Sequence, residues 1–267
     1  MHQVTSFVRR HPLVTFFGLA YGLSWGSYAI LSGPLLFIFG PLLAALIVAS
    51  VTRGKDGLRD VLRRSLRWRV GLTWYAAALC VPVAITLAAV ALNLLLGARV
   101  PTAAPLGPWY SLIFLFPQAL LDAPLGEEPG WRGFALPHLA GGRSPLATTL
   151  ILGLLLAAWH VPIALADRTL AAPYLIGALA SAVVINWVYY HAQESAFLAI
   201  MYHTAQNTIG GWYLFRLFSG PDTVRLWWLF AAVYCGAALS VILVDRRTWQ
   251  ARKPATFARA EVVTNVS

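Results

Sequence analysis

Long apolar stretches alternate with short polar connections along the chain. A helix needs about 20 mostly apolar residues to cross a bilayer, and eight stretches qualify, some only with their polar insertions. They are Pro12–Leu31, Pro34–Val51, Leu72–Leu96, Trp109–Leu125, Pro145–Leu165, Ala171–Tyr190, Ala196–Phe218 and Val224–Val244. The pattern predicts an all-α fold, a polytopic membrane helix bundle with about eight transmembrane helices. Because only Ser32-Gly33 separates the first two stretches, one hairpin that dips into the membrane and returns is an alternative for that pair.

The composition agrees with a membrane protein and excludes other classes. Apolar residues make up 59% of the 267 residues and charged residues 11%, whereas about 25% of residues are charged in soluble domains. The chain therefore lacks the polar surface that a soluble domain needs. Intrinsic disorder is excluded, because so much apolar surface cannot stay unburied. Cys80 and Cys235, the only cysteines, lie in apolar runs, which excludes a disulfide-stapled secreted fold.

Basic residues are divided unequally between the two sides of the predicted bundle. With a cytoplasmic N-terminus, 16 of the 20 Lys and Arg residues fall on the cytoplasmic side, and the four on the other side are Arg99, Arg168, Arg216 and Arg225. Cytoplasmic loops carry such an excess. We therefore expect eight spans with both termini cytoplasmic, in an integral membrane protein.

Membrane lipids are the first partner that the charge indicates. The dense basic block Arg53–Arg69 is predicted to form an amphipathic cytoplasmic interfacial helix, with one side formed by Leu58, Val61, Leu62, Ser65 and Leu66. The net charge of +10 is explained by topology and anionic headgroups. No groove-reading or base-stacking motif accompanies it, so nucleic acid is not expected as a partner.

Ionisable side chains are costly inside a bilayer, so the few in or beside apolar stretches are functional candidates. Glu127 and Glu128 are adjacent, and Arg132 follows Glu128 by four residues. On a continuous helix Glu128 and Arg132 share a face, which leaves Glu127 pointing elsewhere. Pro129 predicts a kink or break at Glu128, because a residue before proline is biased away from the α region. A charge cluster that caps a helix end is the alternative interpretation.

Two histidines and an amide lie in later predicted spans. His160 could be a core histidine bonded to a backbone carbonyl near Pro162. His203 and Asn207 are four residues apart and share one helix face, which is costly in an apolar span unless they face a site or a partner helix. Together with Glu127 this set can deprotonate a water and stabilise an oxyanion. It equally fits a zinc site with two histidines, one glutamate and an open position.

These motifs together resemble those of the CPBP family of intramembrane proteases, which includes CAAX prenyl endopeptidases and bacteriocin-processing or self-immunity proteins. Glu127-Glu128 with Arg132 corresponds to the EExxxR motif, Leu156…His160 stands at the place of FxxxH, and His203…Asn207 matches HxxxN. Leu156 departs from the usual phenylalanine, at a position of apolar packing rather than chemistry. The motif core covers 112–207, within a single integral membrane domain at 1–249 that is followed by a polar tail at 250–267, which we expect to be disordered.

The resemblance implies an intramembrane endopeptidase that cuts a membrane-associated protein or peptide. Glu127 would be the general base that activates water, and His160 would share that water. His203 and Asn207 would hold the oxyanion of the tetrahedral intermediate.

Glu128 and Arg132 would form a supporting pair that orients Glu127. A glutamate-type protease would need no cofactor, whereas a metalloprotease would hold zinc through Glu127, His160 and His203, and the sequence leaves both open. A non-catalytic immunity or regulatory binding protein on the same scaffold is an alternative. A transporter with a proton relay is less favoured, because the chain shows no two related halves.

Overall fold

The computed structural model describes residues 2–31, 36–100 and 107–251, and within these ranges every regular element is a helix. The all-α expectation is thus confirmed for the described part of the chain. The elements in chain order are α1 (His2–Arg10), α2 (Pro12–Leu31), α3 (Gly40–Ser65), α4 (Leu72–Leu95), η1 (Trp109–Ser111), α5 (Leu112–Leu121), α6 (Pro124–Glu128), η2 (Pro129–Ala135), α7 (Leu136–Leu139), α8 (Pro145–Trp159), α9 (Val161–Ala166), α10 (Arg168–His191), α11 (Ala196–Ile209), η3 (Leu214–Leu217), α12 (Pro221–Val244) and α13 (Arg246–Gln250).

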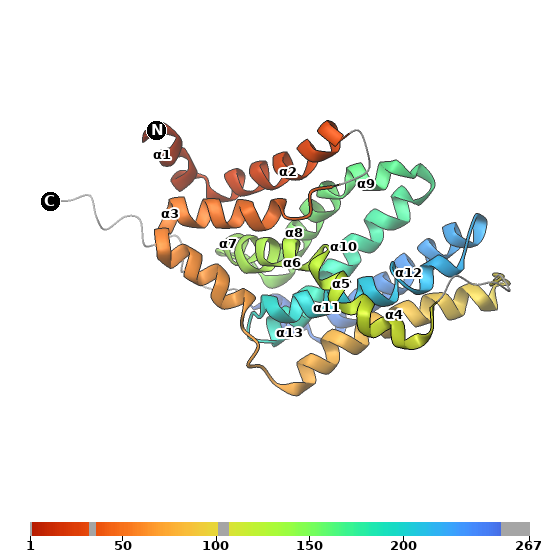
Figure 1. Ribbon diagram of the computed structural model, residues 1–267. Coiled ribbons are helices and arrows are strands. Elements are labelled where there is room, and N and C mark those ends of the chain that lie inside the picture. The colour runs from red at the N-terminus through yellow and green to blue at the C-terminus, as the bar shows by residue number, and fades with distance from the viewer. Residues whose placement is uncertain (1, 32–35, 101–106, 252–267) are drawn as a thin grey trace.

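The helices surround two apolar cores that share α10. α2 lies along α3, and α4 lies along α12 on the other side of the molecule (Figure 1). α3 also packs on η2, α10 packs on both α8 and α12, and α11 packs on α4. One buried cluster joins α2, α3, η2 and α8, and the other joins α4, α10, α11 and α12. The segments that carry the three sequence motifs therefore meet where the two cores adjoin.

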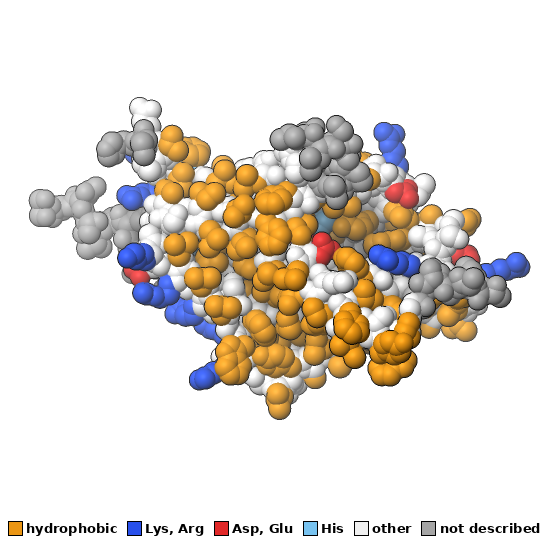
Figure 2. Space-filling view, in the orientation of Figure 1, with side chains coloured by type: hydrophobic (Ala, Val, Ile, Leu, Met, Phe, Trp, Pro, Cys, Tyr) orange, Lys and Arg blue, Asp and Glu red, His pale blue; other side chains and the backbone are white. Residues whose placement is uncertain are grey.

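Among the described residues, three helices are long and apolar enough to cross a membrane. They are α4, α10 and α12, each of 24 residues. Hydrophobic side chains also cover most of the face drawn in Figure 2, and charged side chains lie mainly toward its ends. These features make the chain an integral membrane protein. The number of eight spans and the cytoplasmic position of both termini stay predictions.

The segments around the candidate residues form shorter helices than the apolar pattern predicts. α8 has 15 residues and α11 has 14, so each falls short of the roughly 20 needed to span. The predicted span Pro145–Leu165 divides at His160 into α8 and α9. The predicted span Ala196–Phe218 ends as an α-helix at Ile209, where Gly210 and Gly211 follow. Two successive glycines end the helix because they favour non-helical backbone over helix.

Two further predicted spans have different bounds. The predicted span Trp109–Leu125 is not one continuous helix. α5 ends at Leu121, and the chain turns through Asp122 before α6 starts at Pro124. The predicted span Pro34–Val51 begins as helix only at Gly40, and its first residues lie outside the described part. That helix then continues to Ser65 through a bend at Gly54, which has φ 56°, a conformation that glycine adopts without strain.

The predicted interfacial helix Arg53–Arg69 forms the second half of α3 and ends earlier, at Ser65. The residues of its expected apolar side differ in how far the protein buries them, and its interfacial position stays a prediction. Val61 and Ser65 are buried, whereas Leu62 and Leu66 are exposed. The predicted polar tail begins within α13, which includes Gln250, and residues 252–267 lie outside the described part.

Candidate active site

The first motif lies on a helix that changes its winding without breaking. α6 ends at Glu128, and the chain continues through Pro129–Ala135 as the π-helix η2. Glu128 keeps helical backbone angles of φ −63° and ψ −36°, so the chain is not interrupted at the residue where a kink or break was predicted, and the α-helix instead gives way to π-helical winding there. Pro129 lacks the N–H that would donate to a carbonyl in the preceding turn, and the wider π-turns accommodate this missing donor. Single π-turns inside helices often occur at functional sites.

Two glycines let this motif helix approach the chain that leads into α3. A Cβ on Gly126 would lie 2.6 Å from the carbonyl oxygen of Ile38, and a Cβ on Gly130 would lie 2.5 Å from that of Pro41. Both positions therefore require glycine for close backbone contact. The contact holds the motif helix against α3 and leaves its polar side chains to face α8, α10 and α11.

Glu128 and Arg132 form a buried ion pair whose hydrogen-bond network extends to three other helices. Arg132 Nη1 lies 2.9 Å from Glu128 Oε2, and both side chains are at most 3% exposed. The other Glu128 oxygen, Oε1, lies 2.9 Å from His203 Nδ1 of α11. Arg132 Nε donates to Asn186 Oδ1 of α10 at 2.9 Å, and Asn186 in turn donates to Thr149 of α8 at 3.1 Å. The pair predicted from the four-residue spacing therefore links the motif helix to α8, α10 and α11.

His160 occupies the junction between α8 and α9. Its Nδ1 lies 2.8 Å from the carbonyl oxygen of Leu156. A carbonyl oxygen only accepts, so Nδ1 carries the proton, and a neutral ring has its lone pair on Nε2. The sequence suggested, as a structural alternative, a hydrogen bond from His160 to a backbone carbonyl near Pro162. Such a hydrogen bond is present, and its acceptor is the carbonyl of Leu156. His160 also lines the cavity described next.

All six predicted site residues line one cavity of about 380 Å³. They come from three segments far apart in sequence: Glu127, Glu128, Arg132, His160, His203 and Asn207. Two histidines outside the motifs, His138 and His191, are not among its lining residues. A cavity of this size, with polar groups converging from several helices, is typical of a ligand site.

Two further polar residues at this site, Gln206 and Ser181, were given no role by the sequence analysis. Gln206 Oε1 accepts hydrogen bonds from Ser181 Oγ at 2.9 Å and from Tyr234 Oη at 2.6 Å. Gln206 follows His203 by three residues, and this spacing indicates that both side chains lie on the same face of the helix. Ser181 offered no such signal, since a lone serine in a span commonly bonds its own helix. The wall beyond this network is aromatic and includes Tyr174 and Phe230.

The predicted zinc ligands do not form a metal-binding cluster. Across the described ranges, no group of three His, Cys, Asp or Glu side chains converges as a metal ion would require. Glu127, His160 and His203 share the cavity wall, and because Nδ1 of His203 faces Glu128 and Nδ1 of His160 faces a backbone carbonyl, Nε2 is the nitrogen that each ring leaves for another partner. As they lie among the described residues, these three side chains do not converge as a three-ligand zinc site does.

Comparison with known proteins supports the resemblance. Residues 107–209 match the family model of the Rce1-like type II CAAX prenyl endopeptidases. This segment contains all three motifs and all six predicted site residues. None of the curated proteins matches the chain. The resemblance to CPBP intramembrane proteases is therefore confirmed over this segment, and it indicates a peptide hydrolase within a membrane protein.

Proposed function

We propose that this protein is an intramembrane endopeptidase that hydrolyses a peptide bond of a membrane-associated protein or peptide, with a water activated by Glu127. One observation carries the proposal: Glu127, His160, His203 and Asn207, from three separate segments, line one cavity inside an apolar bundle. Ionisable groups gathered at such a place are costly unless they have a function. The family match over residues 107–209 supports peptide hydrolysis as that function.

The two adjacent glutamates have different surroundings, and this difference supports Glu127 as the base. Both Glu128 oxygens face a cation or a ring nitrogen, from Arg132 and His203. That carboxylate therefore serves to hold α6, η2 and α11 together. Glu127 is 3% exposed and lines the same cavity. It would take a proton from water, the resulting hydroxide would attack the carbonyl carbon, and Glu127 would return the proton to the leaving amine.

His160 is suited to hold that water. With Nδ1–H donated to Leu156, the lone pair on Nε2 of a neutral ring can accept a hydrogen bond from the water. The backbone bond fixes the ring orientation. The water would then lie between an imidazole acceptor and the Glu127 carboxylate.

His203 and Asn207 are suited to bind the oxygen that becomes negative as the bond breaks. They lie one turn apart on α11, and both line the cavity. The Asn207 amide supplies N–H donors. His203 can donate through Nε2 when both ring nitrogens carry protons, and Glu128 at Nδ1 is the counterion that such a ring requires. Donors preorganised around a developing oxyanion are usually the largest single contribution to catalysis.

We infer a substrate that is anchored to, or lies in, the membrane. The matched family is described as prenyl endopeptidases, and the aromatic wall of the cavity suits an apolar group beside the scissile bond. This mechanism uses protein side chains alone, so we expect no cofactor. A non-catalytic immunity or regulatory protein remains the outcome if no cleavage is found.

The test is cleavage of a fluorogenic peptide by the purified protein in lipid nanodiscs. Glu127→Gln keeps the shape but removes the base, so turnover should fall about 10²–10⁴-fold while the unfolding midpoint stays near that of the wild type. Glu194→Gln is the matched control, because it makes the same change outside the cavity, and it should retain activity. A zinc chelator should leave wild-type turnover unchanged.

Glu128→Gln, assayed beside Glu127→Gln, identifies the base. If Glu127→Gln cleaves normally and Glu128→Gln does not, the assignment of the base is wrong. If both variants cleave normally, the protein is not a glutamate protease. Loss of activity with the chelator, restored by zinc, would contradict the metal-free mechanism.

A further inference from the structure

A groove at the junction of α3 and α4 takes no part in the proposed chemistry. It has a volume of about 510 Å³ and is lined by four arginines and three apolar side chains: Arg59, Arg63, Arg67, Arg69, Leu62, Leu66 and Trp68. The three apolar side chains are 50%, 65% and 57% exposed. The groove thus combines uncovered apolar surface with guanidinium groups.

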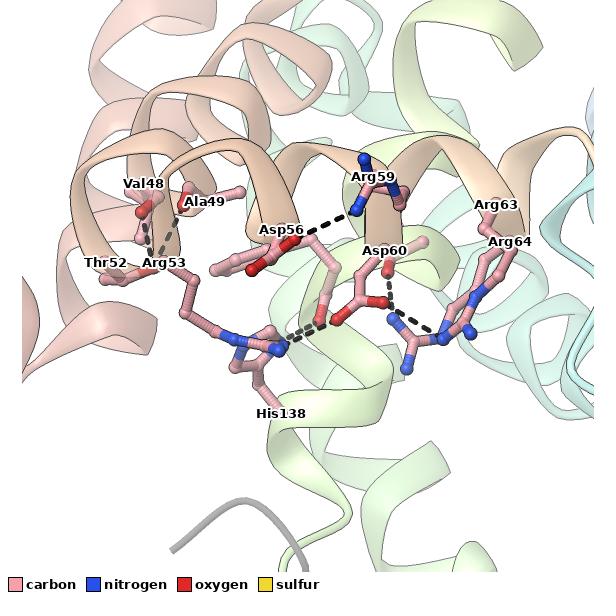
Figure 3. A network of polar contacts seen from close by, with 12 residues as sticks. Val48, Ala49, Thr52, Arg53, Asp56, Arg59, Asp60, Arg63, Arg64 and His138 are labelled. Atoms are coloured by element: carbon pink, nitrogen blue, oxygen red, sulfur yellow. Dashed lines mark hydrogen bonds and ion pairs between the residues drawn. The ribbon is translucent and has the colours of Figure 1, made fainter. Parts of the chain in front are cut away.

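The charge of this groove is strongly one-sided. Residues 53–69 contain seven basic and two acidic residues. Asp60 lies between Arg53 and Arg63, at 2.6 Å and 3.0 Å, and Asp56 pairs with Arg59 at 3.1 Å (Figure 3). These pairs are exposed and therefore weak, so they leave the arginines available to a stronger anion.

Arg67 and Arg69 add positive charge where α3 has ended. Both acids of the segment are already engaged by other arginines. The guanidinium of Arg69 lies over the ring of Trp68, 5.0 Å from its centroid. This stacking holds a cation beside exposed apolar surface, so charge and apolar area occupy the same place.

The position of the groove fixes its depth relative to a membrane. Arg69 precedes Leu72, the first residue of α4, by three residues, and α4 is one of the three membrane-length helices. Leu72 is 85% exposed. Tryptophan and arginine beside the end of a spanning helix are typical of the headgroup level. The groove therefore lies where phosphate groups and the first acyl carbons meet.

We propose that this groove binds an anionic phospholipid. Guanidinium groups bind phosphate oxygens through paired hydrogen bonds, and Arg59, Arg63 and Arg69 surround the site for such a group. Leu62 and Leu66 then contact the start of an acyl chain. A free phosphate ion would leave these leucines in water, so the occupant is a lipid.

Hydrogen bonds connect the groove to the helix that carries His203 of the candidate active site. Arg67 donates to the backbone carbonyl of Gln193, and Ser195 Oγ donates to the carbonyl of Arg67 at 2.6 Å. Ser195 also caps α11, because its Oγ accepts from the N–H of Leu198 at 3.2 Å. A lipid that orders the groove therefore also holds the start of the helix that carries His203.

Lipid binding is measured on the intact protein in detergent, by native mass spectrometry and by thermal unfolding. Phosphatidylglycerol should bind more tightly than phosphatidylcholine and raise the unfolding midpoint. In Arg59→Gln/Arg63→Gln/Arg69→Gln, affinity for phosphatidylglycerol should fall about a hundredfold, since each basic side chain near an anionic lipid contributes roughly a factor of five. Arg99→Gln/Arg168→Gln/Arg216→Gln is the matched control, and includes Arg216, which stacks on Trp212 at 5.7 Å.

Two further measurements separate the parts of the proposal. Leu62→Gln/Leu66→Gln should weaken phospholipid binding while glycerol phosphate binds weakly to every variant. Hydrogen exchange of residues 192–198 should slow when phosphatidylglycerol is added to the wild type, but not to the triple groove variant. Equal lipid responses in the groove and control variants would overturn the site, as would equal binding of the two lipids. Unchanged exchange at 192–198 would overturn the link to α11. These readouts do not depend on proteolysis.

Discussion

The motif helix, formed by α6 and η2, and the helix α12 differ in how far the protein buries them and in how polar they are. Every residue from Gly126 to Pro137 is buried within the protein, and this stretch holds two carboxylates, a guanidinium and π-helical turns. α12 is regular and mostly apolar, and only 22% of its 18-residue apolar stretch is buried inside the protein. Neither helix would be stable in the other's place. Lipid satisfies apolar side chains, whereas the charges and altered hydrogen bonds of the motif helix need protein around them.

The comparison also explains why chemistry is located where the two cores adjoin. The motif helix is enclosed by α3, α8, α10 and α11, and each of the last three supplies a hydrogen-bond partner to its ion pair or that pair's neighbours. α12 supplies no partner to the ion pair in the described structure, and it contributes the Phe230 ring to the cavity wall and a hydrogen bond from Tyr234 to Gln206. Enclosure and polarity therefore occur together in this molecule.

The largest expected effect on stability comes from removing the enclosed cation. Arg132→Gln leaves Glu128 buried without its guanidinium and should lower the free energy of unfolding by about 3–5 kcal/mol. On α12, Arg225 pairs with Asp222 at 2.8 Å while 34% exposed, so Arg225→Gln should cost roughly 1 kcal/mol. Denaturant titrations in detergent micelles measure both. Equal costs would contradict the role of enclosure.

A smaller effect is expected from adding one methyl group to each helix. Gly130→Ala would place its Cβ 2.5 Å from the Pro41 carbonyl oxygen and should destabilise by about 1–3 kcal/mol. Gly236→Ala on α12 meets nothing within 4 Å and should be neutral or stabilise by up to about 1 kcal/mol. Unfolding midpoints of the two variants give the comparison. A neutral Gly130→Ala would show that the α3 contact is loose.

The smallest effect concerns His138, at the end of the enclosed stretch and beside Arg53 in Figure 3. Burial lowers the pKa of His138, and the charge of Arg64 adds to this, whereas the hydrogen bond that the His138 ring donates to the Phe134 carbonyl raises it. The unfolded chain therefore takes up the proton first as the pH falls. Stability from this group is complete above the ordinary histidine pKa and decreases on acidification. Midpoints at pH 7.5 and 5.5 should differ less in His138→Gln than in the wild type. An unchanged difference would assign the pH dependence to other groups.

Much of the architecture was predictable because hydrophobic length and local spacing are properties of the sequence. The apolar pattern identified α4, α10 and α12 as membrane-length helices. The four-residue spacing predicted the contact between Glu128 and Arg132. Both follow from helical geometry, which relates neighbours along the chain without reference to the rest of the fold.

Other features were decided only by the tertiary structure. Packing of α3 against Gly126 and Gly130 and the partners of Arg132 stabilise a π-helix where local preference predicted a break at Glu128. The three motifs lie on segments separated by tens of residues, and only folding places them around one cavity. Leu62 and Val61 were predicted on the same apolar side of an interfacial helix, but only Val61 is buried in the protein, because Val61 and Arg64 contact Gly133 of η2 whereas Leu62 faces away and is exposed. Sequence determines which residues share a face, and the neighbours available in the fold determine which face is buried.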